Sequence, residues 1–338
     1  MKVDGTLSWD EAAHLASIFE RQGLDGAIST EGAREGFFPL LLAGQATERL
    51  ELMTGVAIAF ARNPMIVAQQ ANDLQQLIGG RFLLGIGPQI RPHIENRFSM
   101  TWSRPAARMR EFVLAIRAIW DSWAGGERLD FRGEFYTHTL MTPMFNPGPN
   151  PYGFPPIIMA GVGERMVEVA GEVADGLLVH PLNSPDFLEG HTIPALERGA
   201  ARAGRSLDGF QLAVMSFCMM GSNDEEIERA RQNVRAQMSF YGSTPAYRPP
   251  LDHHGWGDLQ PELNRLSKQG GWAEMTKLIS DDMLDTFGVS GTPSEIGRKL
   301  RARNATAQRT NLMLVNETDP EAVSDLVAAI KESRGQAE

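Results

Sequence analysis

Residues 50–87 read LELMTGVAIAFARNPMIVAQQANDLQQLIGGRFLLGIG and contain a complete strand–helix–strand unit. The apolar and β-branched run at 50–59 predicts a buried strand, and the apolar run at 82–87 predicts a second one. Between them, residues 64–77 have apolar positions at helical spacing and begin with proline, which suits the first helical turn. This order of elements is typical of a parallel sheet that is covered by helices.

The same alternation continues on both sides of this stretch. Further strands are predicted at 2–7, 26–30, 156–160, 176–180, 211–221 and 311–316. A first helix is predicted between Ser8, which can cap its start, and Gly23, which ends it. Further helices are predicted at 38–46, 107–123, 166–174, 185–203 and 320–332, and a long one begins at 224. Eight strands with helices between them favour a closed barrel over an open sheet of five or six strands. The predicted fold class is therefore α/β, a single (β/α)8 TIM barrel.

The length of the chain fits one such barrel with insertions. A (β/α)8 barrel takes about 250 residues, and the chain has 338. The surplus lies in three segments that exceed short connections, at about 88–105, 124–154 and 240–290. The third is an irregular, aromatic-rich stretch that is suited to covering an apolar ligand. We expect one domain over residues 1–338, with the insertions over the site at the C-terminal face of the barrel, where active sites of this fold lie.

Charge and composition exclude several classes of function. The 32 Lys and Arg residues against 42 Asp and Glu give a net charge of −10, which argues against binding to nucleic acid or to anionic membranes. Residues 1–5 lack the apolar core of a signal peptide, and no stretch reaches the roughly 18 apolar residues of a membrane helix. A cytoplasmic protein is therefore expected. The seven histidines lack the spacing of a zinc-hydrolase motif, so no metal site is predicted.

Two glycine-rich turns follow predicted strands. Gly85 and Gly87 begin like a dinucleotide fingerprint, but the third glycine is absent, so we expect only a sharp turn at the end of the fourth strand. The sequence GVGERM at 161–166 joins the fifth strand to a helix. Its glycines allow backbone N–H groups to approach an anion at the helix N-terminus, and Arg165 can add charge-assisted hydrogen bonds to a phosphate. An ordinary strand-to-helix turn is the alternative.

Three side chains near the ends of predicted strands are candidates for proton transfer. Glu31 follows the second strand, His93 lies in the insertion after the fourth, and His180 closes the sixth. The alternatives are a solvated glutamate and histidines with a purely structural role.

Several longer stretches are similar to one known family. They read TGVAIAFARNP (54–64), LIGGRFLLGIG (77–87), HIENRFSMTW (93–102) and EVADGLLVH (172–180). With these motifs the chain resembles the luciferase-like flavin monooxygenase superfamily, and specifically its coenzyme F420-dependent branch of bacterial barrel oxidoreductases, over nearly its whole length. The later stretches FYGSTPAY and LDHHGWG, at 240–247 and 251–257, resemble one subgroup of that branch.

The resemblance implies a deazaflavin or flavin at the C-terminal mouth of the barrel. It places Gly55 and Val56 at a strained bulge, often with a non-prolyl cis peptide, behind the cofactor ring. By position, His93 would hydrogen-bond the cofactor, and His180 would lie on the substrate side. The full set of implied cofactor-binding residues is Gly55, Val56, Ala57, Gly87, His93, Gly161, Val162, Gly163, Arg165 and Met166.

The chain also departs from the family pattern. Dehydrogenase relatives commonly have a histidine at the end of the second strand and a glutamate after the fourth-strand glycines, whereas this chain has Glu31 and Ile90 there. Asn183 occupies the place of a lysine that binds sugar phosphate in those relatives. A sugar-phosphate substrate is therefore not expected.

The leading functional hypothesis is hydride transfer between F420 and an unidentified apolar organic substrate, with Glu31, His93 or His180 handling the proton. A second hypothesis is an FMN-dependent monooxygenase that uses oxygen and reduced flavin from a possible separate reductase. A third is a barrel that binds a cofactor without catalysis. Aromatic residues that suggest an apolar substrate pocket are Phe60, Trp102 and Trp256. The resemblance also implies a homodimer or a higher homo-oligomer.

Overall fold

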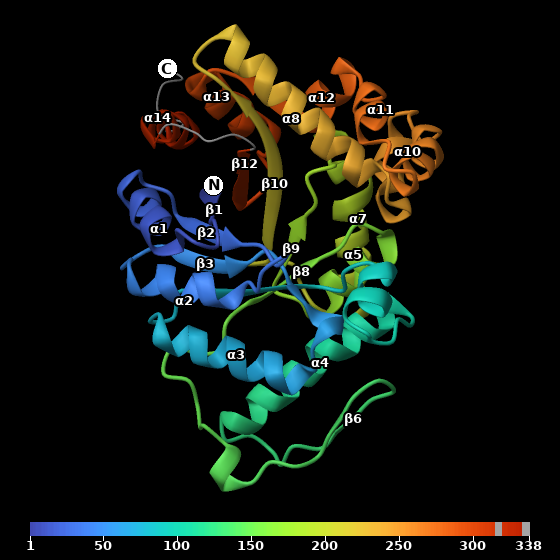
Figure 1. The fold of residues 1–338 in the computed structure, drawn as a ribbon. Coiled ribbons are helices and arrows are strands. Elements are labelled where there is room, and N and C mark those ends of the chain that lie inside the picture. The colour runs from blue at the N-terminus through green and yellow to red at the C-terminus, as the bar shows by residue number, and fades with distance from the viewer. Residues whose placement is uncertain (315–319, 333–338) are drawn as a thin grey trace.

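A computed structural model describes residues 1–314 and 320–332, and a closed barrel of parallel strands lies at its centre (Figure 1). Eight strands form the barrel, each pairs with the next around the ring, and the last pairs with the first. In order they are β1 (Lys2–Thr6), β2 (Gly26–Ser29), β3 (Glu51–Thr54), β5 (Phe82–Gly87), β8 (Ile157–Ala160), β9 (Gly176–Val179), β10 (Gln211–Met220) and β12 (Arg309–Leu314). The predicted (β/α)8 barrel is confirmed. The last two residues of the predicted strand 311–316 lie outside the described residues.

Helices between the strands surround the barrel (Figure 1). They are α1 (Ala12–Arg21), α2 (Phe37–Gln45), α3 (Pro64–Leu77), α4 (Pro105–Trp123), α5 (Glu164–Val173), α6 (Pro185–Phe187) with η4 (Leu188–Thr192), α7 (Ile193–Arg202), α8 (Asp224–Gly242), α13 (Pro293–Arg303) and α14 (Pro320–Lys331). Gly23, with a φ of 82°, follows the end of α1 as predicted, but the N-cap is Glu11 and not Ser8. The N–H of Leu7 still donates to the carbonyl of Ile28, so residues 8–11 are needed to turn the chain before the helix begins.

The predicted strand at 50–59 is interrupted in its middle. β3 ends at Thr54, and the peptide bond between Gly55 and Val56 is cis. A short strand, β4 (Ala57–Ile58), follows and pairs with the end of β5. The non-prolyl cis peptide that the family resemblance implies is therefore present.

A strand at 288–291 was not predicted. β11 (Gly288–Gly291) pairs with residues 217–220 at the far end of β10, which is the long strand in the upper half of Figure 1. β12 pairs with β10 along 213–218, so β9 and β11 share the other edge of β10, one after the other. The sequence GVSG is too short and too rich in glycine to give a strand pattern.

The segment 240–290 is mostly helical, which corrects the prediction of an irregular stretch. It contains η5 (Pro245–Tyr247), α9 (Arg248–His253), α10 (Leu259–Lys268), α11 (Trp272–Lys277) and α12 (Asp281–Phe287). These helices share an apolar cluster with α8 that is separate from the barrel core. Helices of six to ten residues separated by glycine and proline give too few turns for a clear helical period.

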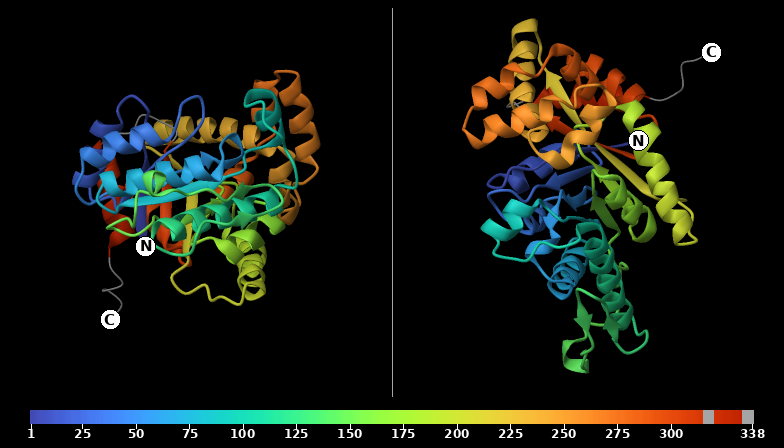
Figure 2. Two further views of the ribbon diagram at one scale, coloured as in Figure 1. Left: turned by 90° about the horizontal axis from the view of Figure 1, so that it is seen from below. Right: turned by 90° about the vertical axis from the view of Figure 1, so that its right-hand side faces the viewer.

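The segment 124–154 lies elsewhere than expected. It starts where α4 ends and leads to β8, so both of its ends are at the amino ends of the strands, opposite the C-terminal mouth. Its hairpin of β6 (Phe131–Arg132) and β7 (Thr137–His138) projects from the α4 side of the molecule (Figure 2). The Glu111 carboxylate on α4 accepts three backbone N–H groups from residues 134–136. This segment therefore packs outside the barrel and does not cover the mouth as predicted.

The interior of the barrel has a polar lower layer and an apolar layer above it. In the lower layer, the Arg309 Nε donates to Asp4 Oδ2 at 2.7 Å, and the Asn311 amide donates to the same oxygen at 2.9 Å. Burial raises the pKa of Asp4, although Arg309 opposes this effect. The apolar layer consists of Ile28, Met53, Leu83, Ile158, Leu178 and Ala213. The barrel is thus a filled core whose upper surface is the floor of the mouth.

Candidate active site

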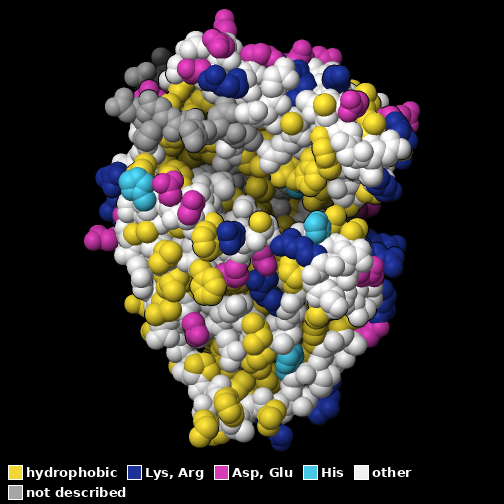
Figure 3. Space-filling view, in the orientation of Figure 1, with side chains coloured by type: hydrophobic (Ala, Val, Ile, Leu, Met, Phe, Trp, Pro, Cys, Tyr) yellow, Lys and Arg dark blue, Asp and Glu magenta, His cyan; other side chains and the backbone are white. Residues whose placement is uncertain are grey.

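The floor of the mouth is apolar. Val56, Ala160 and Met215 pack on the apolar layer of the barrel and are themselves only partly buried. Ala160 and Met215 each lie two residues beyond a member of that layer, and alternate side chains of a strand point to the same face. The molecular surface is hollowed between the 240–290 helices and the 88–105 segment (Figure 3). A flat apolar ring would find a matching surface on this floor.

The glycines of β5 allow the cis peptide to lie close to the strand. A Cβ on Gly85 would lie 1.7 Å from the carbonyl oxygen of Thr54, and one on Gly87 would lie 3.0 Å from Val56 Cγ2. Both glycines are part of β5, so the predicted sharp turn at this point is wrong. Close packing of two backbones, not turn geometry, requires glycine at position 85.

The turn between β8 and α5 leaves space for a ligand at its backbone. Gly163 is the exposed N-cap of α5, and a Cβ built on it would meet no atom within 4 Å. The first N–H groups of a helix have no partner within the helix, and they carry the positive end of its dipole. Arg165 is exposed and forms no ion pair with any described residue. These groups fit a phosphate.

The other residues of this turn support it. A Cβ on Gly161 would lie 2.6 Å from Met166 Cγ, so the methionine side chain fills the space beneath the turn. The N–H of Met166 donates to the carbonyl of Gly163 at 2.9 Å and is not free for a ligand. Val162 is partly buried between the two glycines. Among the residues predicted here, Gly163 and Arg165 are the ones that the structure leaves open.

His180 faces the mouth from the end of β9. Leu178 belongs to the inner layer of the barrel, and His180 follows it by two residues on the same face. The His180 ring stacks on Tyr247 with a centroid distance of 4.0 Å and meets the edge of Tyr241 at 4.6 Å. Burial beneath these rings lowers the pKa of His180 to about 3. His180 is therefore uncharged at neutral pH.

Glu31 is held by an arginine that the sequence analysis did not single out. Its Oε2 lies 2.7 Å from Arg62 Nη1 and accepts the backbone N–H of Ile58 at 2.8 Å. The side chain of Glu31 is 8% exposed and that of Arg62 is 13% exposed. This carboxylate joins the end of β2 to the chain beyond the cis peptide, a positioning role that leaves it poorly placed for proton transfer.

His93 is the first residue of η2 (His93–Arg97), in the insertion after β5. Its backbone N–H donates to the carbonyl of Ile90 at 3.1 Å. Its ring is partly buried and has no hydrogen-bond partner among residues 1–314 and 320–332. The imidazole is therefore free to interact with a ligand.

The three predicted pocket aromatics do not form one group. Phe60, fully buried, meets the edge of Trp102 at 5.5 Å and lies under the guanidinium of Arg108 at 4.4 Å. Trp256 belongs to the apolar cluster of α8 and the 240–290 helices, next to His254. Phe60 is thus a core residue that packs against Trp102 and Arg108. His180 is covered instead by the rings of Tyr241 and Tyr247. Both come from the aromatic-rich stretch of the third insertion.

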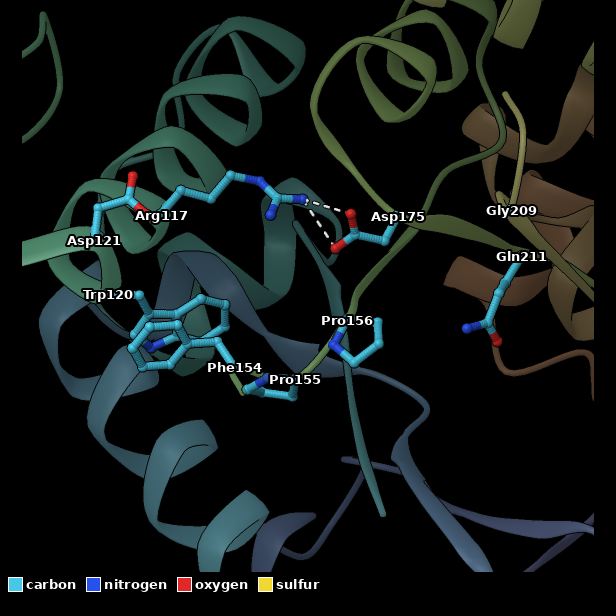
Figure 4. A pocket seen from close by; sticks show the side chains of 9 residues that line it. All are labelled: Arg117, Trp120, Asp121, Phe154, Pro155, Pro156, Asp175, Gly209 and Gln211. Carbon is cyan, nitrogen blue, oxygen red and sulfur yellow. Dashed lines mark hydrogen bonds and ion pairs between the residues drawn. The ribbon is translucent and has the colours of Figure 1, made fainter. Parts of the chain in front are cut away.

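A hollow of about 460 Å³ lies at the opposite end of the barrel (Figure 4). Arg117 bonds both Asp175 oxygens at 2.9 Å there, and Trp120 stacks on Phe154 at 5.1 Å. The hollow is lined by Arg117, Trp120, Asp121, Phe154, Pro155, Pro156, Asp175, Gly209 and Gln211. It lies beside the amino ends of β8, β9 and β10, whereas active sites of this fold lie at the carboxyl ends. Its ion pair is satisfied internally, so the mouth remains the candidate site.

Within residues 1–314 and 320–332, no three His, Cys, Asp or Glu side chains lie close enough together to hold a metal ion. No helix in the same part of the chain is long and apolar enough to cross a membrane.

Comparisons with known sequences identify relatives over most of the chain. Residues 1–310 match the family model described as luciferase-like monooxygenase. An uncharacterised protein of Mycobacterium tuberculosis is 52% identical over 305 residues, which cover 90% of this chain and 90% of that protein. The 5,10-methylenetetrahydromethanopterin reductase of Archaeoglobus fulgidus is 27% identical over 299 residues, which cover 86% of this chain and 85% of the reductase.

Solved structures share the fold. The coenzyme F420 dependent tetrahydromethanopterin reductase of Methanopyrus kandleri superposes with a TM-score of 0.78 at 21% identity, covering 96% of each chain. An F420-dependent secondary alcohol dehydrogenase superposes with a TM-score of 0.76 at 18% identity, also covering 96% of each chain. Together with the match of residues 1–310 to the family model, these findings show that the chain belongs to the luciferase-like monooxygenase family and is an oxidoreductase of that class.

Proposed function

We propose that the protein binds coenzyme F420 at the C-terminal mouth and transfers a hydride between it and an apolar organic substrate. The observation that carries the proposal is the open turn at Gly163 and Arg165 beside the apolar floor of Val56, Ala160 and Met215. A phosphate and a flat ring are the two parts of this cofactor that such a site would hold. The names of the relatives, an F420-dependent reductase and an F420-dependent alcohol dehydrogenase, support the same cofactor.

The α5 turn is suited to the phosphate group. The first backbone N–H groups of α5 point out of the helix, and Arg165 supplies the positive charge that the protein as a whole, at −10, does not. Glu164 is the nearest acidic side chain in the sequence, and its carboxylate is bound by Arg198. This pairing offsets the repulsion that a free carboxylate would exert on an anion.

The floor and the aromatic cover are suited to the ring and to the substrate. A deazaflavin ring accepts or releases a hydride at carbon when it is bound, and the protein has to orient it and keep water out. Val56, Ala160 and Met215 offer apolar contact from below. Tyr241 and Tyr247 close the side above β9. His93, whose ring is free, is placed to carry a proton or to hydrogen-bond the cofactor.

Titration of the purified protein with F420 and with FMN, followed by fluorescence, tests the proposal. We expect F420 to bind, and Arg165→Ala to weaken this binding about tenfold or more, because a hydrogen bond between charged groups is lost. Arg298→Ala, which removes an exposed arginine on α13, is the matched control and should bind F420 normally. Binding of FMN together with failure to bind F420 would overturn the proposal.

An FMN-dependent monooxygenase is the second candidate function. One solved structure with the same fold is a Baeyer-Villiger monooxygenase in complex with FMN, with a TM-score of 0.68 at 16% identity. In that case reduced FMN, supplied by a separate reductase, would react with oxygen at the water-excluded floor. Oxygen consumption that depends on both reduced FMN and substrate would favour this function over hydride transfer from F420.

A second copy of the chain is the expected partner, and α2 and α3 offer the surface for it. Phe38 and Leu42 on α2 are 67% and 51% exposed, and Ile66 and Leu77 on α3 are 45% and 63% exposed. The two helices contact each other, and all four side chains are exposed on this neighbouring pair. Apolar side chains exposed on neighbouring helices favour association with another protein surface over exposure to water.

A further inference from the structure

His180 is fixed in the mouth by three contacts. Its ring is stacked on Tyr247 with an interplanar angle of 18°, and Tyr241 meets it nearly at a right angle, 80°. The third contact is a hydrogen bond from the backbone N–H of Leu182 to His180 Nδ1 at 3.2 Å. The ring therefore has one orientation, set by the barrel on one side and by the third insertion on the other.

The hydrogen bond from Leu182 determines which ring nitrogen carries the proton. A nitrogen that accepts an N–H cannot itself be protonated, so in the neutral ring the hydrogen is on Nε2. No described residue accepts a hydrogen bond from Nε2, and this atom is not among the fully buried polar atoms without a partner. Nε2–H is thus a donor without an acceptor among the described residues, on a ring that follows the carboxyl end of β9.

Among the residues that the structure describes, the contacts of His180 do not favour a second proton on the ring. The hydrogen-bond and ring contacts of His180 are made by Leu182, Tyr241 and Tyr247, and none of these is a carboxylate. Burial raises the pKa of both tyrosines, so they too are uncharged at neutral pH. The ring is consequently a hydrogen-bond donor and neither a cation nor a base.

We propose that His180 donates its Nε2–H to the oxygen of a carbonyl substrate, and that Tyr241 and Tyr247 are positioning residues that hold the ring in this form. This inference rests on the proposed function and names the class of its substrate, an apolar ketone or aldehyde. Such a neutral donor stabilises negative charge that develops on oxygen without first losing a proton of its own.

The reaction balances with the cofactor of the proposed function. When bound, reduced F420 would supply the hydride that forms a C–H bond at the carbonyl carbon, and the C=O π electron pair would move to the oxygen. His180 would stabilise this oxygen until a proton, carried from solvent by His93, reaches it. The substrate is reduced to an alcohol and the deazaflavin is oxidised, and the reverse reaction oxidises an alcohol.

Nuclear magnetic resonance of the ¹⁵N-labelled protein without cofactor tests the state of the ring. We expect one neutral, Nε2-protonated His180 ring that does not change between about pH 5 and about pH 8, where ordinary histidines titrate. Tyr247→Phe keeps the stacking and should leave this signature unchanged. Tyr247→Leu removes the stacking and should bring the protonation of His180 into that pH range. A ring that titrates there in the unmodified protein would overturn the proposal.

Binding of cyclohexanone and of methylenecyclohexane, which has =CH₂ in place of the carbonyl oxygen, tests the substrate class. We expect cyclohexanone to shift the His180 ring N–H signal, and His180→Leu to weaken its binding about two- to tenfold, the effect of one neutral hydrogen bond. His180→Gln carries an amide N–H near the position of Nε2 and should retain most of the affinity. The affinity for methylenecyclohexane should be the same in all three proteins. His14→Gln, on the exposed surface of α1, is the control.

The proposal would be overturned if His180→Leu and the unmodified protein bound cyclohexanone with equal affinity. It would also be overturned if His180→Gln lost affinity for cyclohexanone while His180→Leu did not. If His180→Leu fails to fold by circular dichroism, the His180 ring N–H signal of the unmodified protein still decides, because absence of a shift on addition of cyclohexanone would overturn the proposal. Both measurements use the protein without cofactor. Failure to bind F420 would therefore overturn the proposed function and leave this assignment of His180 to be judged separately.

Discussion

Arg62 Nη1 lies 2.7 Å from Glu31 Oε2, so an ion pair joins the end of β2 to the chain that follows the Gly55–Val56 peptide. The same carboxylate oxygen accepts the N–H of Ile58. The chain that follows β2 and the chain of β4 are thus tied together at the carboxyl end of the barrel. The pair is largely shielded from water, and its role is to hold the floor in place.

Glu31→Gln is therefore expected to lower the free energy of unfolding and to leave turnover largely unchanged. The nearly buried Arg62 would lose its charged partner, at a cost of about 1 to 3 kcal/mol in the free energy of unfolding. Glu35→Gln, which removes the weaker and more exposed contact to Arg62 at 3.4 Å, should cost less than about 1 kcal/mol. Unfolding in urea measures both. Unchanged stability of Glu31→Gln with loss of turnover would instead identify Glu31 as the acid or base.

Gly163→Ala and Gly161→Ala form a matched pair in the α5 turn. A methyl group at position 163 meets nothing in the protein, so stability should change by less than about 1 kcal/mol while F420 binding weakens. A methyl group at position 161 would lie 2.6 Å from Met166 Cγ and should lower stability by about 1 to 3 kcal/mol. Thermal unfolding and F420 titration of both variants separate the two effects. Normal F420 affinity of Gly163→Ala would show that the phosphate lies elsewhere.

His180 gives the stability of the protein a pH dependence. Its pKa is about 3 in the folded protein against 6.5 as the ordinary value, so below pH 6.5 the unfolded chain binds a proton that the folded protein excludes. The contribution to stability is complete above pH 6.5 and falls with pH, by at most about 1.4 kcal/mol per pH unit, until about pH 3. Urea unfolding at several pH values should show a shallower slope for His180→Gln. Identical slopes for the two proteins would contradict the burial of a neutral ring.

Arg309 lies at the centre of the barrel, where its loss should be costly. Arg309→Met would leave the buried carboxylate of Asp4 without its cation, and we expect a loss of about 3 to 5 kcal/mol. Lys2→Met breaks an exposed ion pair with Glu51 on the same side of the barrel and should cost less than about 1 kcal/mol. Chemical unfolding of both variants gives the comparison. Similar small losses would mean that the interior layer contributes little.

Self-association through α2 and α3 is tested by introducing charge there. Leu42→Glu should convert a dimer into a monomer, because an apolar contact would be replaced by a desolvated carboxylate. Leu140→Glu is the control, since Leu140 is 77% exposed on the segment 124–154, away from α2. Light scattering after gel filtration reports the mass. A Leu42→Glu protein with unchanged mass would place the interface elsewhere.

The barrel was predictable because its strands and helices have strong, local signals. The boundaries of α3 and β5 follow directly from Pro64 and from the apolar run that ends at Gly87. The third insertion was not predictable in the same way. Its short helices are stabilised by contacts with α8 and with one another, which no local window of sequence contains.

The candidate site shows the same difference between residues with a local sequence signal and residues that only the fold brings together. Gly163, Arg165 and His180 were found from their positions at the ends of strands, and the structure leaves the first two open and turns the third into the mouth. The pairing of Glu31 with Arg62 joins residues that are 31 apart, across two separate elements. Only the fold brings these two side chains together, so the sequence alone suggested a free carboxylate where the structure has a fixed one.

β10 connects the floor and the cover of the site through one continuous strand. Its residue Met215 lies in the floor, while residues 217–220 pair with β11, to which the helices of the third insertion lead. Because β10 is one continuous strand, we expect a change in the position of the third insertion to displace the backbone at Met215, in the floor of the mouth. Sequence changes in the insertion, far from any ligand, can in this way retune the shape of the reaction chamber without altering the turn at Gly163.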